Sequence, residues 1–573
     1  MQDFIKNGKP NTMYKNIEYA DERENMKKLY GFDTMCTAKF LTSTLYLQSG
    51  HTHSCYHPQP HKIPLEEIKD NPSALHNTKH KIEVRKQMLL GERPEECNYC
   101  WRVEDIDDSQ LSDRIIKSKN ELLLTPDAHE QILENGWDHN YRPTYLEISF
   151  GNECNMKCAY CHPKASSAWQ KEMDLEGLFP DAPHLQVLED KIYKEEENPY
   201  VEAFWKWWPY LRKTLKVIRV TGGEPLLQQN VWKFLSKLQE TGECSEMVLQ
   251  INTNLNIKNK LVARMCDMVN KLLKEKKIKR FQIFSSIESW GDRATYARNG
   301  LDLELFEKNV ETIMDKMGHH HVDSFNGIQI MNTYNIMCVT SYVNFLEKIL
   351  EWRRKYQNGL AHPKIMFDIP HCTEPNHWTL IGLPDEYSEY VSLTSDFFQR
   401  WKWKANWHKY PPEEHNHEYH MYFSEEEVRA WNRVESMWKN ICDRRAQVQT
   451  DEYLEPRAID DARRNWYLFI KSTDERRGTD FKKTFPEMVD YYDLCATMYD
   501  ISEMEYNRKC KDELMKDEVI DFHWDDDFVW HHPRLAKSLI NWRKIRNMPT
   551  QMFSNDELVG AFGNFEGQED EKQ

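Results

Sequence analysis

The stretch 151-GNECNMKCAYCHP-163 places Cys154, Cys158 and Cys161 in a C-x3-C-x2-C array directly after the short apolar run 145-YLEIS-149. Three thiolates on one short loop can each bind one iron of a cubane 4Fe–4S cluster, and the fourth iron is then left without a protein ligand. An open coordination position distinguishes a catalytic metal site from a closed structural one. The alternatives for this loop are a zinc knuckle and a cluster that only transfers electrons.

Short apolar runs alternate with segments of helical period from about residue 144 to residue 370. Successive strand and helix units predict an α/β fold with a parallel sheet, curled into a TIM-like barrel or part of one. In such sheets the chemistry gathers where strands end and loops begin, which is where the cysteine loop stands. The predicted strands are 145–149, 215–220, 247–252, 280–284, 328–332 and 364–369.

The cysteine loop, with Tyr160 before its last cysteine, resembles the cluster-binding motif of the radical S-adenosylmethionine (SAM) superfamily. The segment 221-TGGEP-225, which follows the second predicted strand, matches the Gly-Gly-Glu-Pro element of that family. Paired glycines let the backbone approach a ligand closely. The resemblance implies that the three cysteines hold the SAM-binding cluster and act in catalysis, and that the amino group of SAM is bound by Gly222, Gly223, Glu224 and Pro225.

Further elements of this resemblance follow the third strand. The segment 253-TNLN-256 stands where the family usually has Thr-Asn-Gly, so Thr253 and Asn254 are candidate SAM contacts, and Leu255 departs from the usual glycine. Asn332 and Asn335 are further candidates to line the SAM pocket, and their alternative role is loop capping.

The fourth predicted strand ends in 285-SSIES-289, which is similar to the Ser-Ile-Asp element that binds the SAM ribose in this family. The resemblance therefore implies Ser286 and Glu288 as ribose contacts, because a carboxylate can accept hydrogen bonds from both hydroxyls. Arg298 stands where relatives often place an arginine on the SAM carboxylate. A surface ion pair is the alternative for this arginine.

A second group of thiols comprises Cys36, Cys55, Cys97 and Cys100. Four thiolates make a closed site, for which zinc and a 4Fe–4S cluster are nearly equal options by residue chemistry alone. The segments 50-GHTHSCYHP-58 and 91-GERPEECNYCW-101 resemble the twitch domain, a module that binds one auxiliary 4Fe–4S cluster. Its position before the barrel matches the group called twitch domain-containing radical SAM proteins, within the SPASM/twitch subset. No histidine is expected to be a ligand.

Charge and hydropathy exclude several classes of function. The chain has 573 residues and a net charge of −17, which argues against a dedicated nucleic-acid binder. Its mean hydropathy of −0.81 and the lack of a long apolar run argue against a membrane span. The first residues lack the hydrophobic region of a signal peptide, so we expect a cytoplasmic protein with reduced thiols.

The chain is expected to divide into four parts: an N-terminal arm or loosely docked helix (1–30), the cysteine-rich module (31–110), the radical SAM core (140–375) and a mainly helical extension (376–573). The module has one plausible hairpin strand, 44–47, and is expected to bury little apolar area, so that a metal group would supply its stability. In the extension, Ser424 and Glu427 predict a capping box, 534–547 a helix, and the last residues a disordered tail.

The resemblance implies a radical SAM oxidoreductase that cleaves SAM to a 5′-deoxyadenosyl radical and oxidises or cross-links a peptide or a small polar metabolite. It also implies an electron donor such as flavodoxin or ferredoxin. One alternative is a noncatalytic zinc-binding interaction protein. Another is a radical SAM enzyme with a structural zinc at the N-terminal cysteines.

Overall fold

The computed structural model describes residues 16–106, 112–118, 127–177, 179, 191–194, 197–356, 364–402, 422–448 and 457–500. Residues 1–491 form one compact unit, and residues 492–573 form a second. Only residues 492–500 of the second unit are among those described, and they are helical.

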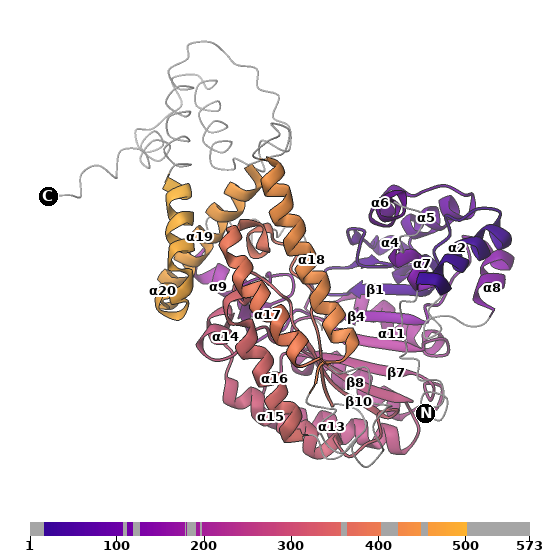
Figure 1. The fold of residues 1–573 in the computed structure, drawn as a ribbon. Coiled ribbons are helices and arrows are strands. Elements are labelled where there is room, and N and C mark those ends of the chain that lie inside the picture. Colours follow the sequence, from indigo (N-terminus) through magenta and orange to yellow (C-terminus); the bar gives the residue numbers. More distant parts are fainter. Residues whose placement is uncertain are drawn as a thin grey trace, which may run out of the picture. The chain divides into compact units, whose positions relative to one another are not determined.

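One sheet of nine strands runs through the first unit, in the order β11-β10-β8-β7-β6-β4-β1-β2-β3 (Figure 1). Six strands of this sheet pair in parallel with one another, which confirms the parallel sheet predicted from the alternating pattern. They are β4 (Tyr145–Ser149), β6 (Val217–Thr221), β7 (Val248–Thr253), β8 (Arg280–Ser286), β10 (Phe325–Met331) and β11 (Ile365–Asp368).

The two faces of this sheet differ in chemistry because side chains alternate along each strand. One row that crosses the sheet in register is apolar and fully buried, and it consists of Ile148, Val220, Ile251, Ile283 and Ile328. The neighbouring row is polar, and it consists of Glu147, Arg219, Gln250 and Gln282. The sheet therefore presents one apolar face for helix packing and one face suited to polar groups.

Helices connect the parallel strands, as expected for strand and helix units. In α15 the periodic residues Phe306, Val310, Ile313 and Met317 are buried, as their spacing predicts. Helices α13 and α15 pack against each other, as Figure 1 shows. The helices of this part are α9 (Ser167–Glu176), α11 (Pro199–Leu211), α12 (Gln229–Gln239), α13 (Asn259–Lys274), α14 (Asp292–Ala297), α15 (Leu303–Met317) and α16 (Tyr342–Tyr356).

The cysteine-rich segment shares the sheet of the core. Strand β1 (Thr42–Tyr46) pairs in parallel with β4, and it forms the predicted hairpin with β2 (His51–His53), followed by β3 (His61–Lys62). Short helices surround these strands (Figure 1): α2 (Asn16–Tyr30), α3 (Ala38–Leu41), α4 (Leu65–Asp70), α5 (Lys79–Leu89), α6 (Asn98–Ile106), α7 (Asp113–Ser118) and α8 (Ala128–Asn135).

The expectation that this segment buries little apolar area is wrong. Phe40, Met88 and Trp101 of this segment belong to one buried cluster with Cys36 and Cys97, to which Met26 and Ile115 from outside the segment also belong. Because these residues come from several short helices, no single stretch of sequence shows an amphipathic pattern long enough to recognise.

The described part of the C-terminal extension is helical, as predicted. The capping box at the start of α18 is confirmed, because Ser424 N donates to Glu427 Oε2 at 2.9 Å and Glu427 N donates to Ser424 Oγ at 3.2 Å. The predicted helix 534–547 and the predicted disordered tail lie outside the described residues. The helices here are α17 (Ser388–Arg400), α18 (Glu425–Val448), α19 (Arg457–Arg477) and α20 (Phe481–Thr484).

Among the described helices, none combines the length and the apolar character that crossing a membrane requires.

Candidate active site

The cysteine loop is fixed between strand β4 and helix α9. Asn152 Nδ2 donates to Pro163 O at 3.1 Å, Ser167 Oγ accepts from Cys154 N at 3.0 Å, and Trp169 Nε1 donates to Cys158 O at 2.9 Å. Ser166 begins the helix by accepting from Trp169 N. None of these bonds involves a thiol of the loop.

The three thiols of this loop lie close enough to interact. Burial, followed by the neighbouring thiols Cys158 and Cys154, raises the pKa of Cys161 to about 12. Burial and then Cys158 raise the pKa of Cys154 to about 11. A metal group would compensate this penalty, because coordination supplies positive charge to thiolates.

The Gly-Gly-Glu-Pro turn rests directly on the cysteine loop. Glu224 N donates to Glu153 O at 2.7 Å, and Gly222 has a φ of 118°, which L side chains rarely adopt. A Cβ atom on Gly223 would lie 2.4 Å from Glu153 O, closer than real contacts allow. Both glycines are therefore required for the close approach of the two segments.

Glu224 connects this turn to the end of the third parallel strand. Its carboxylate accepts from Thr253 Oγ1 at 3.0 and 3.1 Å and from Asn254 N at 2.7 Å, and the side chain is fully buried. Burial raises the pKa of Glu224 to about 7, although these hydrogen bonds act in the opposite direction. The carboxylate thus has partners within the chain, and Asn254 Nδ2 lies 4.0 Å from Cys154 Sγ.

Leu255 has a backbone conformation that favours glycine, the residue that the resemblance leads one to expect at this position. Its φ is 51°, in the left-handed region, and its side chain is fully buried. The left-handed conformation costs an L-residue about 1–2 kcal/mol relative to glycine.

We therefore expect Leu255→Gly to be at least as stable as Leu255→Ala, with a gain of up to about 1 kcal/mol in the free energy of unfolding. Both variants lose the buried side chain, so both are less stable than the natural protein. The control is Leu249, which is also fully buried, on strand β7, and has no positive φ. At residue 249 the alanine variant should have the larger free energy of unfolding in denaturant. If the alanine variant were also the more stable one at residue 255, the prediction would be contradicted.

Arg298 and Glu288 form a buried ion pair next to the cysteine loop. Arg298 Nε donates to Glu288 Oε2 at 2.7 Å, and the side chains are 4% and 3% exposed. Tyr160 donates its hydroxyl to Glu288 Oε1 at 2.5 Å. Arg298 therefore does not lie in a surface ion pair, which was the alternative for this residue.

A short antiparallel ladder explains why Arg298 reaches the loop. Strand β5 (Lys157–Cys158) pairs with β9 (Arg298–Asn299), so Cys158 faces Arg298 across the ladder. A guanidinium nitrogen of Arg298 lies 3.4 Å from Cys158 Sγ. This cation lowers the pKa of the Cys158 thiol, but the larger effect of burial leaves that pKa raised.

The remaining predicted SAM contacts differ in their surroundings. Ser286 is half-buried at the end of β8. Asn335 caps its own loop, because it donates to Thr333 O and accepts from Met337 N. Asn332 donates to Ile287 O, while its Oδ1 and Ser285 Oγ are buried without a partner among the described residues. Ser285 was not among the sequence candidates, although it stands within the segment that supplied two of them.

The N-terminal cysteines also share one neighbourhood. Cys36 and Cys55 interact electrostatically, and both raise the pKa of Cys97 and of Cys100. Burial is the largest contribution and brings the pKa of each of these two thiols to about 12. Cys97 ends the 3-10 turn η2 (Glu95–Cys97), and Cys100 lies one turn later on α6.

The histidines near these cysteines have other partners. His57 Nε2 lies 2.9 Å from Asp113 Oδ2, and His61 Nε2 lies 2.9 Å from Thr78 Oγ1. Across the part of the chain that the structure describes, no three His, Cys, Asp or Glu side chains converge as ligands of a single ion. A four-iron cube binds each thiolate at a different iron, so a cysteine set can fit it without converging on one point.

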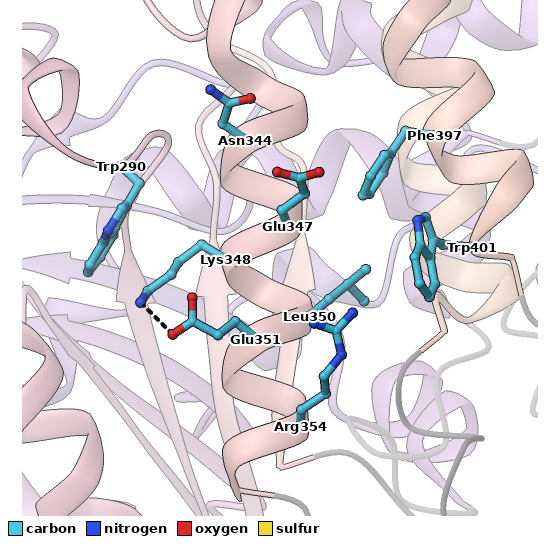
Figure 2. A pocket seen from close by; sticks show the side chains of 9 residues that line it. All are labelled: Trp290, Asn344, Glu347, Lys348, Leu350, Glu351, Arg354, Phe397 and Trp401. Carbon is cyan, nitrogen blue, oxygen red and sulfur yellow. Dashed lines mark hydrogen bonds and ion pairs between the residues drawn. The ribbon is translucent and has the colours of Figure 1, made fainter.

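A pocket of about 440 Å³ lies along α16, between Trp290 and the residues Phe397 and Trp401 (Figure 2). Two cations, Lys348 and Arg354, line it, and Lys348 is paired with Glu351 at 3.0 Å and with Glu307 at 2.6 Å. None of the predicted site residues lines it. Its lining consists of Trp290, Asn344, Glu347, Lys348, Leu350, Glu351, Arg354, Phe397 and Trp401.

The chain is similar to several curated enzymes named GTP 3',8-cyclase. It is 28% identical over 111 residues to the one from Campylobacter lari, which covers 19% of this chain and 28% of the relative. The match to the Helicobacter pylori (strain 26695) protein is 32% over 108 residues, covering 19% and 27%. The Heliobacterium modesticaldum protein is 25% identical over 172 residues, covering 30% and 46%.

The matches thus span less than half of the length of these relatives. No protein-family model matches the chain. The relatives are radical SAM enzymes. Together with the cysteine loop and the turn that packs on it, these similarities support placing the chain in the radical SAM superfamily.

Proposed function

We propose that this protein is a radical SAM oxidoreductase whose active site lies at the carboxyl ends of β4, β6, β7 and β8. One observation carries the proposal: the cysteine loop, the Gly-Gly-Glu-Pro turn, the Thr253 segment and the Arg298–Glu288 pair are joined by direct contacts. When bound, the cluster and SAM supply a 5′-deoxyadenosyl radical that removes a hydrogen atom from the substrate.

The donor set fits these groups. Cys154, Cys158 and Cys161 would hold the cluster through three thiolates. The backbone of Gly222, Gly223 and Pro225 would face the amino group of SAM, because the carboxylate of Glu224 already has partners within the chain. The unpartnered oxygen atoms of Ser285 and Asn332 are also available to a polar ligand.

The ribose of SAM is assigned to Ser286 and Glu288. A carboxylate has about four acceptor sites, and the contacts from Arg298 and Tyr160 use three of them, so Glu288 can accept from one ribose hydroxyl while it stays paired with Arg298. Arg298 has five N–H donors, and contacts to Glu288, Tyr160 and Cys158 use four of them. At most one donor is left for the SAM carboxylate, so Arg298 would act mainly by orienting Glu288 and by stabilising the thiolate of Cys158.

The N-terminal cysteines Cys36, Cys55, Cys97 and Cys100 are proposed to hold an auxiliary 4Fe–4S cluster. With all four ligands supplied by the protein, this site would accept an electron from the substrate radical rather than bind substrate. The net reaction would then be an oxidation or a cross-link, with flavodoxin or ferredoxin as the donor for SAM cleavage.

The substrate is proposed to be a peptide or a small polar metabolite, bound within a partial (β/α)6 barrel formed by the parallel strands. The polar row on the sheet supports this class. Arg219 Nε donates to Asn252 Oδ1 at 2.9 Å and its guanidinium lies over the Phe284 ring at 4.1 Å, next to the predicted SAM segments. Tyr56 and Tyr145 hydrogen-bond Glu147 in the same row.

The test is anaerobic reconstitution with iron and sulfide, followed by metal analysis and by incubation with SAM and dithionite. The proposal requires about eight irons per chain and formation of 5′-deoxyadenosine. About four irons plus zinc, with 5′-deoxyadenosine, would favour a structural zinc at the N-terminal cysteines. Zinc without iron and without 5′-deoxyadenosine would favour the zinc-binding interaction protein instead.

A further inference from the structure

Lys81 is a buried cation beside the N-terminal cysteines. Its Nζ donates to Thr52 Oγ1 at 2.8 Å, to Ser43 Oγ at 3.2 Å and to His53 O at 3.3 Å, and the residue is 4% exposed. All three acceptors are neutral, and no Asp or Glu of the described residues forms an ion pair with it. Burial, and then the cations Arg85 and Lys39, lower the pKa of Lys81 well below its usual value. A buried charge without a counter-charge is costly, so Lys81 needs a negative group nearby to stay protonated.

Four further cations to compare with Lys81 are Lys39, Arg85, Arg114 and Lys117. Three of them have carboxylate partners, in the pairs Lys39–Glu96, Arg114–Glu104 and Lys117–Asp113. Arg85 is fully buried and, like Lys81, donates only to neutral groups, namely Lys39 O, Asn77 Oδ1 and His76. Two buried positive charges therefore lack a described acidic partner.

Two acidic groups interact electrostatically with Lys81, namely Glu96, whose carboxylate is already paired with Lys39 and His80, and the thiol of Cys55. Lys81 interacts electrostatically with Cys55, Lys39 with Cys97, and Arg114 with Cys36. Four thiolates around a 4Fe–4S core carry a net negative charge, which grows by one unit when the cluster accepts an electron. The positive charge of Lys81 is opposite in sign to that charge and can offset it.

We propose that Lys81 is a counter-charge of the auxiliary cluster and raises its reduction potential. This inference rests on the proposed function, which supplies both the cluster and, from the substrate radical, the electron. A fixed cation stabilises the reduced cluster more than the oxidised cluster, because the reduced form is more negative. Lys81 would thus favour transfer of the electron from the substrate radical to the cluster.

The test uses the full chain with Cys154, Cys158 and Cys161 all replaced by alanine, so that only the N-terminal site can hold a cluster. After anaerobic reconstitution, the midpoint potential is measured by redox titration with electron paramagnetic resonance. Lys81→Met should shift the equilibrium between oxidised and reduced cluster at least tenfold toward the oxidised form. This corresponds to a midpoint potential lower by about 59 mV. Lys81→Arg, which keeps the charge, should shift it less than Lys81→Met.

Lys364→Met is the matched control. Lys364 is also 4% exposed, and its Nζ donates only to His320 O at 2.8 Å and Phe325 O at 2.7 Å. Because it lies at the amino end of β11, away from the N-terminal cysteines, the potential should not change.

If Lys81→Met bound four irons with an unchanged midpoint potential, the role of Lys81 would be overturned, whereas the proposal of an auxiliary cluster would stand. Zinc instead of iron, or neither metal, in the background variant would overturn both. If Lys81→Met does not retain the cluster, the iron contents of Lys81→Gln and Lys81→Arg are compared. A cluster retained only in Lys81→Arg supports the role of Lys81 as a counter-charge. Loss of the cluster from both variants overturns that role.

Discussion

Replacing Cys158 with alanine should reduce the yield of 5′-deoxyadenosine to less than roughly a hundredth of that of the natural protein. Substitutions of groups that merely support metal ligands cost about 10–100-fold, and Cys158 is proposed as a ligand itself. The variant also separates the thiol from Arg298, which contacts it at 3.4 Å. The iron content should fall from about eight to about four per chain, because the N-terminal site is untouched.

Cys442→Ala provides the control for this experiment. Cys442 is a half-buried cysteine near the end of α18, outside both cysteine groups. Its replacement should leave the iron content and the yield unchanged. If Cys158→Ala and the natural protein gave equal yields of 5′-deoxyadenosine, the assignment of the cluster to this loop would be refuted.

The parallel sheet could be predicted from the sequence because each strand is a short apolar run bounded by helical segments. The predicted run 145–149 coincides with β4 (Tyr145–Ser149), and the others shift by up to a few residues. Such shifts are expected, since hydrophobic pattern locates a strand better than it locates its ends. The pairing of β1 with β4 could not be predicted, because about 100 residues separate them in the sequence and β1 alone gives no sign of its neighbour.

The proposed ligands could be chosen from sequence motifs, but their mutual contacts could not. Arg298 was selected for a role on SAM, whereas the structure pairs it with Glu288, Tyr160 and Cys158. The two-residue ladder that brings it there is too short to have a pattern of its own. Likewise, the left-handed backbone of Leu255 follows from its tertiary setting, since leucine disfavours that conformation.

Breaking the Arg298–Glu288 pair from one side should have a large effect on both stability and SAM binding. Arg298→Met leaves a buried carboxylate without its counter-charge, which typically costs about 3–5 kcal/mol in the free energy of unfolding. The same change frees Glu288 from its position beside Tyr160, so SAM should bind roughly tenfold to a hundredfold more weakly. Denaturant unfolding and SAM titration of the anaerobic protein measure the two losses.

A double variant, Arg298→Met with Glu288→Gln, should recover part of the stability, because neither buried charge remains. It should not recover SAM binding, since the carboxylate that would accept from a ribose hydroxyl is lost. Stability that recovers while SAM binding does not would separate the structural role of the pair from its role in binding SAM.

Arg353→Met is the matched control for the single variant. Arg353 forms a similarly buried pair with Glu427, with side chains 0% and 8% exposed, between α16 and α18. Its loss should cost a comparable free energy of unfolding, but SAM should bind as in the natural protein because no predicted SAM contact touches Arg353. Equal weakening of SAM binding by both variants would show that Arg298 acts only by stabilising the fold, and unchanged binding in Arg298→Met would remove the Arg298–Glu288 pair from the SAM site.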